Sequence, residues 1–427
     1  MQYITDLRVA YLVVVFFVFI NGFFLPFGIN STIVAPLLFV FYIPYSSPRF
    51  FSILRLVFLS NVSLLVFGAI TLMIVANLIV LAVNSSLDFS NLKVYIGHLY
   101  LHAFILLFYT ISVDMFRGRA PQFEIFGNVF VLAFIVQSLI QIFAFFSPQF
   151  ASFVHLFYPH ELYEKMYLGY NGSRGLSMSG SPGWGLSVGY AVAFLALSFF
   201  GFYRKRVAFL NLYLMSILFI GSLFAGRTAL VGLALGLLIY LFGRPLSQLI
   251  KEFSLFLALA VVIFILSNLA GYSITTIFPT EKFYRAFEFL FSYIESGKFE
   301  TSSTNRLIEM WGAPIGEDEY FFGSGLKLEP DGSGYYQDTD VGYLRTILYG
   351  GLFWLSLKFL FHLSFLVGLF VRSENRSGLV LLTFIFFLGL LLELKAEAIT
   401  YNKYFFISYL SFFIFYFLDG RGFRGKS

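Results

Sequence analysis

Residues 54–83 read LRLVFLSNVSLLVFGAITLMIVANLIVLAV, and beyond Arg55 this stretch holds no charged side chain. A helix that crosses the hydrocarbon core of a bilayer needs about 20 consecutive, mostly apolar residues. The stretch exceeds that length, so it predicts a membrane-spanning helix that tilts strongly or extends beyond the lipid.

Apolar segments of this kind recur along the whole chain, with polar breaks between them. The segments expected to span the membrane are 9–27, 31–45, 54–83, 93–116, 124–146, 184–202, 207–224, 228–243, 253–270, 342–371, 377–394 and 403–419. The expected fold is an all-α polytopic membrane protein with about twelve transmembrane helices, in which residues 1–427 form one domain. The first segment has no small-residue cleavage site before it and is expected to be retained.

The composition excludes a soluble protein. Hydrophobic residues make up 59% of the chain and charged residues only 12%, which is about half the charged fraction of a soluble domain. The 60 Phe and 27 Tyr suit a lipid-facing surface with aromatic belts at its interfaces. The net charge of +5 is expected in cytoplasmic loops, with no role in nucleic-acid binding, and the absence of cysteine excludes disulfides and thiolate metal sites.

Basic residues indicate which side of the membrane each connection occupies, because Lys and Arg are enriched in cytoplasmic loops. If the N-terminus is inside, every cytoplasmic connection is basic, whereas the short external connections hold only Lys93, Arg227, Lys395 and Lys403. This asymmetry predicts that both termini are cytoplasmic. The external connections 147–183 and 271–341 are too long to be mere connectors, and we expect them to carry the chemistry.

Two candidate anion-binding residues are Arg174, in a Gly- and Ser-rich part of the first external loop, and Arg227, at the external start of an apolar helix. Guanidinium groups bind phosphate in a bidentate manner, and the nearby glycines would let a ligand approach the backbone of a flexible loop. The alternatives are a solvated loop residue for Arg174 and an interfacial, snorkelling residue for Arg227.

The second external loop contributes Arg306, Asp338 and Asp340. Arg306 lies three residues before Glu309, so on a helix the two can simply form a local ion pair. A carboxylate at Asp338 or Asp340 can act as a general base or orient a hydroxyl, but Asp340 can also cap the helix that follows. Together, the external arginines and aspartates suit a substrate with a pyrophosphate leaving group and a hydroxyl nucleophile.

Other polar residues carry less weight. His98 and His102 share a helical face, but no third metal ligand is near in the sequence. Lys358 and His362 lie near the middle of the tenth expected span, where a charge marks a functional site, an internal polar contact or a shifted span boundary. The charged residues in 393–397 lie at a helix end and are expected to pair with one another.

With this topology the chain resembles the bacterial O-antigen polymerase (Wzy) and O-antigen ligase group of integral-membrane glycosyltransferases. Short motifs carry the resemblance together with the twelve spans and two large loops. They are Arg174 with Gly185, Arg306 with Gly316 (one residue closer than the pattern), Gly226-Arg-Thr-Ala-Leu, Phe322-Gly-Ser-Gly, and Asp340-Val-Gly-Tyr-Leu followed by Tyr349-Gly-Gly-Leu.

The resemblance implies a GT-C-like enzyme of the bacterial inner membrane, acting in lipopolysaccharide biosynthesis at its periplasmic face without a metal or cofactor. Undecaprenyl-pyrophosphate-linked glycan would be transferred to another lipid-linked repeat unit, and a polysaccharide chain-length regulator is a further partner. Arg227 and Arg306 would then bind pyrophosphate, Arg174 and Asp338 would bind substrate, and Asp340 would face the acceptor hydroxyl. The aromatic rings of the external loops, including Tyr335, Tyr336 and Trp311, would stack on sugar faces or anchor the loops at the interface.

Two other activities stay open. An O-antigen ligase would transfer polysaccharide to the lipid A core, but ligases usually have a histidine where this chain has Asp340, which favours a polymerase. A flippase for lipid-linked oligosaccharide would show internal repeats and charges near the bilayer midplane. No repeat stands out, and Lys358 is the feature that points to transport.

Overall fold

The computed structural model describes residues 6–26, 28–117, 120–169, 172, 174–203, 208–242, 247, 254, 292–295, 297, 302–331, 334–372 and 377–419. Within these ranges the chain is helical, with isolated β-bridges and no strand. The predicted all-α class is therefore confirmed for this part of the chain. Apart from position 254, the expected span 253–270 lies outside the described residues.

Five of the described helices are long and apolar enough to cross a membrane. They are α4 (Asn61–Val83), α5 (Ser90–Met115), α6 (Gln122–Phe146), α9 (Trp184–Tyr203) and α18 (Gly342–Arg372). Shorter helices lie at other expected spans: α1 (Leu7–Asn21), α10 (Ala208–Ala225), α11 (Ala229–Phe242), α19 (Ser377–Glu393) and α20 (Lys403–Asp419). These helices are those of a membrane-embedded protein, while the number of twelve spans stays a prediction.

Two expected spans are interrupted. The segment 54–83 is divided between α3 (Phe50–Phe58) and α4, because the side chain of Ser60 accepts the N–H of Ser63 at 3.2 Å and begins a new helix. The segment 31–45 consists of the short α2 (Ser31–Val34) and two 3-10 turns. Pro36 and Pro44 lie in these turns, where their missing N–H groups prevent a regular α-helix.

The chain divides into two compact units. Unit 1 comprises Met1–Ala35 and Gly127–Thr301, and unit 2 comprises Pro36–Phe126 and Ser302–Ser427. Helix α9 lies in unit 1. It is the most deeply buried of the five long apolar helices, since 94% of its most apolar stretch is buried. A Cβ at Gly232 of α11 would lie 2.2 Å from the Ala191 carbonyl oxygen of α9, a close approach that small residues permit in membrane helix pairs.

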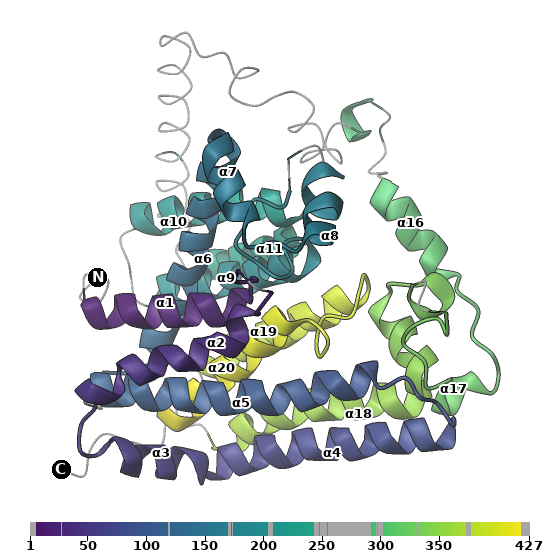
Figure 1. Ribbon diagram of the computed structural model, residues 1–427, viewed down its shortest axis with the longest axis horizontal. Coiled ribbons are helices and arrows are strands. Elements are labelled where there is room, and N and C mark those ends of the chain that lie inside the picture. The colour runs from purple at the N-terminus through teal and green to yellow at the C-terminus, as the bar shows by residue number, and fades with distance from the viewer. Residues whose placement is uncertain are drawn as a thin grey trace. The chain divides into compact units, whose positions relative to one another are not determined.

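In unit 2, α4, α5 and α18 run side by side, and α20 packs against α4 and α5 (Figure 1). Aromatic side chains fill this interior. The ring of Phe126 lies 4.9 Å from that of Phe412 and 4.5 Å from that of Phe415, and Trp354 of α18 meets Tyr95 of α5 edge-on at 5.6 Å. Part of the high phenylalanine content therefore serves the core, in addition to the lipid-facing surface expected from the sequence.

Helix α18 is interrupted at Gly350 and Gly351, where the backbone angles are not helical. The segment 322–325, which follows α17 (Glu319–Phe322), packs directly against this break. The N–H groups of Ser324 and Gly325 donate to the carbonyls of residues 348 and 349 at 2.7 and 2.8 Å. The two glycine motifs of the second loop and the tenth span thus form one backbone-to-backbone contact.

Candidate functional site

Three segments that are far apart in the sequence meet in unit 2: the α4–α5 connection, residues 322–328, and the α19–α20 connection. The Asn84 side chain donates to the Phe322 carbonyl at 3.1 Å, and the Ser86 hydroxyl donates to the Gly325 carbonyl at 2.8 Å. All three segments were predicted to be external. The side of the membrane that they occupy stays a prediction.

The carboxylate of Asp88 fixes the backbone of the second loop. It accepts the N–H groups of Lys327 at 2.6 Å and Leu328 at 3.1 Å, as well as that of Ser90 at 2.9 Å. Partial burial alone would raise the pKa of Asp88, but these hydrogen bonds outweigh it and lower the pKa. Asp88 is therefore a charged anchor between the α4–α5 connection and the loop.

Beyond this anchor the loop folds back as a short hairpin. An antiparallel bridge pairs Leu328 with Tyr335. The N–H of Tyr336 donates to the Lys327 carbonyl at 3.2 Å, and the N–H of Glu329 donates to the Gly334 carbonyl at 3.0 Å. The hairpin leads from the anchored segment to the start of α18.

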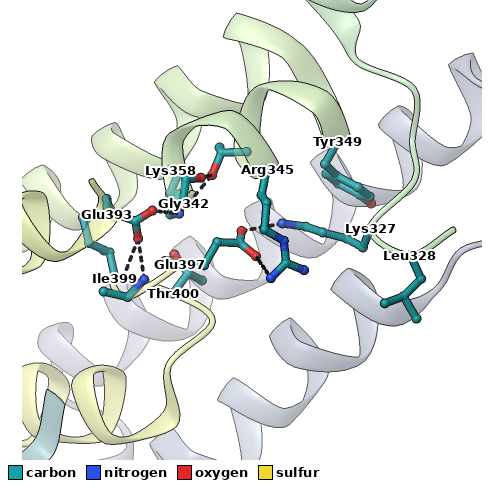
Figure 2. Close-up of polar contacts among 12 residues, drawn as sticks. Lys327, Leu328, Gly342, Arg345, Tyr349, Lys358, Glu393, Glu397, Ile399 and Thr400 are labelled. Carbon is teal, nitrogen blue, oxygen red and sulfur yellow. Dashed lines mark hydrogen bonds and ion pairs between the residues drawn. The ribbon is translucent and has the colours of Figure 1, made fainter. Parts of the chain in front are cut away.

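A buried ionic cluster adjoins the hairpin and consists of Lys327, Arg345, Lys358, Glu393 and Glu397 (Figure 2). Lys327 forms an ion pair with Glu397, whose side chain is only 5% exposed, and Arg345 approaches the other oxygen of Glu397 at 3.5 Å. Removing one partner of such a buried pair leaves an uncompensated charge. The cluster is therefore expected to act as a unit.

Within the cluster, neighbouring charges and burial shift the pKa values of Glu397 and Lys327. Burial alone would raise the pKa of Glu397, but the adjacent cations, led by Lys327, outweigh it and lower the pKa to about 2. Burial lowers the pKa of Lys327 to about 8, against the opposing effect of the Glu397 carboxylate.

The inner pair of the cluster joins α18 to the end of α19. The Lys358 ammonium donates to Glu393 at 3.0 Å and to the Thr346 hydroxyl at 3.1 Å, which confirms the interpretation of Lys358 as an internal polar contact. The other oxygen of Glu393 accepts the N–H groups of Ala398 and Ile399 at 2.9 and 2.7 Å. Glu393 and Glu397 thus pair with cations of α18 and the hairpin. The sequence had indicated only pairing among the charged residues of 393–397.

Arg345 lies between the ionic cluster and an exposed tyrosine. Its guanidinium carbon is 3.7 Å from the ring centroid of Tyr335 and 5.5 Å from that of Tyr401, distances typical of cation–π contacts. The Arg345 side chain is 6% exposed, whereas Tyr335 is 41% exposed. The carboxylate of Asp340 interacts electrostatically with the same guanidinium.

Arg306 lies on α16 (Ser302–Trp311) and pairs with two carboxylates. The expected ion pair with Glu309 is confirmed at 3.3 Å, and Asp338 forms a second one. Hydrogen bonding to Asp338 and Glu309 raises the pKa of Arg306. Gln337 and Asp338 have left-handed φ angles of 59° and 44°, an unfavourable conformation for residues other than glycine.

Asp340 precedes α18 and is tied to α16. Its N–H donates to the Met310 sulfur at 3.3 Å, and the Thr339 hydroxyl donates to the Met310 carbonyl at 3.1 Å. Thr339 also accepts the N–H of Val341 at 3.3 Å. Thr339 therefore forms a local turn just before α18, and across the described ranges no hydrogen bond reaches the Asp340 carboxylate, so no capping bond from Asp340 is seen.

Tyr336 is engaged with α17 instead of presenting a free hydroxyl. Its O–H donates to Glu319 at 2.8 Å. Partial burial and this hydrogen bond raise the pKa of Tyr336. Of the two neighbouring tyrosines, Tyr335 has the more exposed side chain.

Arg174 and Arg227 both belong to unit 1 and are partly buried. The turn that contains Arg227 is fixed by Ser187 of α9, whose hydroxyl donates to the Gly226 carbonyl and accepts the N–H of Ala229, both at 3.0 Å. This turn joins α10 to α11, as the sequence predicted.

The prediction of a flexible loop around Arg174 is wrong for the residues that follow Arg174, because these residues pack inside unit 1. Ser177 and Ser179 are fully buried. A Cβ at Gly180 would lie 2.2 Å from the Gly22 carbonyl oxygen at the end of α1. The glycine here permits a close approach of two backbones, where a ligand had been expected.

The predicted site residues of the second loop, Arg306, Tyr336, Asp338 and Asp340, come together in unit 2. A joint site with Arg174 and Arg227 stays a prediction, since those residues belong to unit 1. The histidines 98 and 102 have core contacts: the first stacks on Phe406 at 3.6 Å and the second contacts the Ser63 hydroxyl at 3.2 Å.

Comparison of the chain with protein-family models, curated proteins and solved structures gave no match.

Proposed function

We propose that the chain is a membrane glycosyltransferase that polymerises a surface polysaccharide from undecaprenyl-pyrophosphate-linked repeat units. The bond between the donor's anomeric carbon and the pyrophosphate oxygen breaks, and a hydroxyl oxygen of the acceptor repeat unit bonds to that carbon. The hydroxyl proton passes to the Asp340 carboxylate and then to water, and the pyrophosphate leaves on its lipid carrier. Arg306 stabilises the negative charge that develops on the pyrophosphate.

The observation that supports this function most is the connection between α16 and the start of α18. Two hydrogen bonds to Met310 and the ion pair between Arg306 and Asp338 join these segments. A cation suited to pyrophosphate and a carboxylate suited to a hydroxyl therefore belong to one local structure. The roles proposed for Arg174 and Arg227 rest on the family resemblance.

Deletion of the gene tests the proposal in cells. A polymerase predicts lipopolysaccharide that carries a single repeat unit, and full-length chains in the deletion strain would rule it out. Loss of all O-antigen from the lipid A core would instead identify a ligase, and trapping of repeat units on the cytoplasmic leaflet would identify a flippase.

Reconstitution tests the chemistry directly. Purified full-length protein, incubated with the host's own lipid-linked repeat unit, should give a ladder of products that differ by one repeat. The absence of any ladder from folded protein would count against polymerisation.

A further inference from the structure

Tyr335 differs from the other aromatic residues of the second loop because one face of its ring is covered by a buried cation. The guanidinium carbon of Arg345 is 3.7 Å from the ring centroid, while 41% of Tyr335 remains exposed. With that face covered, the edge and the opposite face are the parts of the ring left for a ligand.

The ring is also held in place before any ligand arrives. Its backbone pairs with Leu328, whose N–H is bound by Asp88. Arg345, behind the ring, is held by Glu397 at 3.5 Å and belongs to the first turn of α18. A surface that is already ordered costs little conformational entropy on binding.

We infer that Tyr335, backed by Arg345, is a stacking platform for a pyranose ring of the acceptor glycan, an inference that rests on the proposed function. One face of a pyranose presents C–H groups with partial positive charge, which are attracted to the negative face of an aromatic ring. The hydroxyls at the sugar's edge need polar partners, and the Asp340 carboxylate interacts with the same guanidinium that backs Tyr335. Asp340 also follows Tyr335 closely in the sequence, so the platform and the carboxylate proposed to receive the acceptor's proton belong to the same segment before α18.

The test uses full-length protein in detergent with three variants. Tyr335→Phe keeps the aromatic face, Tyr335→Leu removes it, and Tyr320→Leu is the matched control, since Tyr320 is 48% exposed on the same loop. With lipid-linked donor held constant and a water-soluble repeat-unit oligosaccharide as acceptor, we expect Tyr335→Leu to raise the acceptor KM about three- to tenfold. Its kcat should stay near that of the wild type, Tyr335→Phe should have a lower acceptor KM than Tyr335→Leu, and the control Tyr320→Leu should leave both constants unchanged.

Equilibrium dialysis with the same radiolabelled oligosaccharide measures binding without catalysis. If Tyr335→Leu binds the oligosaccharide more weakly while Tyr320→Leu does not, the stacking role of Tyr335 is supported. This holds even if the wild type forms no polymer and the proposed function fails. Polymerisation with unchanged KM and unchanged binding in Tyr335→Leu would overturn the platform and leave the proposed function intact. If Tyr335→Leu does not fold, Tyr335→Met, which also lacks a ring face, takes its place with the same expected outcomes.

Discussion

The backbone of Gly351 lies directly against that of Phe321: a Cβ at position 351 would be 2.1 Å from both the carbonyl carbon and the carbonyl oxygen of Phe321. The φ angle of Gly351 is +65°, which side chains also disfavour. We expect Gly351→Ala to lower the free energy of unfolding by about 1–3 kcal/mol through overpacking. Thermal unfolding in detergent measures the change.

The control for that substitution lies in the same helix. A Cβ at Gly368 would meet nothing within 4 Å, so Gly368→Ala should leave stability unchanged or raise it slightly through helix propensity. Equal unfolding temperatures for the two variants would show that the contact at the helix break is unimportant.

The stability of the protein should fall in acid because of Glu397. Its pKa is lowered to about 2 from the ordinary value of 4.5, so between these pH values the unfolded chain binds more protons than the folded one. This contribution is fully present above pH 4.5 and is lost as the pH falls toward 2. Unfolding temperatures measured across this range should show a smaller acid-induced decrease in Glu397→Gln than in the wild type.

The pair Lys358 and Glu393 should be costly to break from one side. Both side chains are at most 3% exposed, so Lys358→Met leaves Glu393 without its ion-pair partner and should destabilise the protein by about 3–5 kcal/mol. The double variant Lys358→Met/Glu393→Gln removes both charges and should lose less. If the double variant lost as much as the sum of the two single ones, the residues would not be coupled.

Arg306 should affect activity more than folding. Its side chain is 51% exposed, so Arg306→Gln should keep the wild-type unfolding temperature while lowering kcat about a hundredfold, as expected for loss of a charge that stabilises the leaving group. Glu309→Gln, which removes one of its two ion pairs, should retain activity. Loss of activity in Glu309→Gln alone would assign the essential role to the pair and not to the arginine.

Most long helices of the described ranges were predictable because length and hydropathy alone specify them, as in α5 and α6. The break before α4 was not, since Ser60 is a single polar residue in an apolar run and acts through one local hydrogen bond. The packing of residues 322–325 on Gly350 and Gly351 could not be predicted from the sequence either. Both motifs were visible, but nothing in their sequences indicated that they touch.

The candidate site was predictable only in part. Arg306 and Glu309 pair because of helical spacing, which a sequence displays. Lys327 and Arg345 were missed because one lies in the middle of a long polar loop and the other inside an expected span, and Glu397 was expected to pair only with its neighbours in 393–397. Glu397 pairs with Arg345 and Lys327 through tertiary contacts across 52 and 70 residues (397 − 345 and 397 − 327), which the sequence does not display.

The break in α18 also has a consequence for depth in the bilayer. With a rise of about 1.5 Å per residue, the roughly 21 residues from 352 to 372 extend about 31 Å, close to the hydrocarbon thickness of about 30 Å. The part of α18 before the break, Gly342 to Tyr349, is then not needed to span the hydrocarbon core. It can lie in the hydrated headgroup layer, where, under the proposed function, Arg345 and Tyr335 would meet the acceptor sugar while the lipid carrier stays in the membrane.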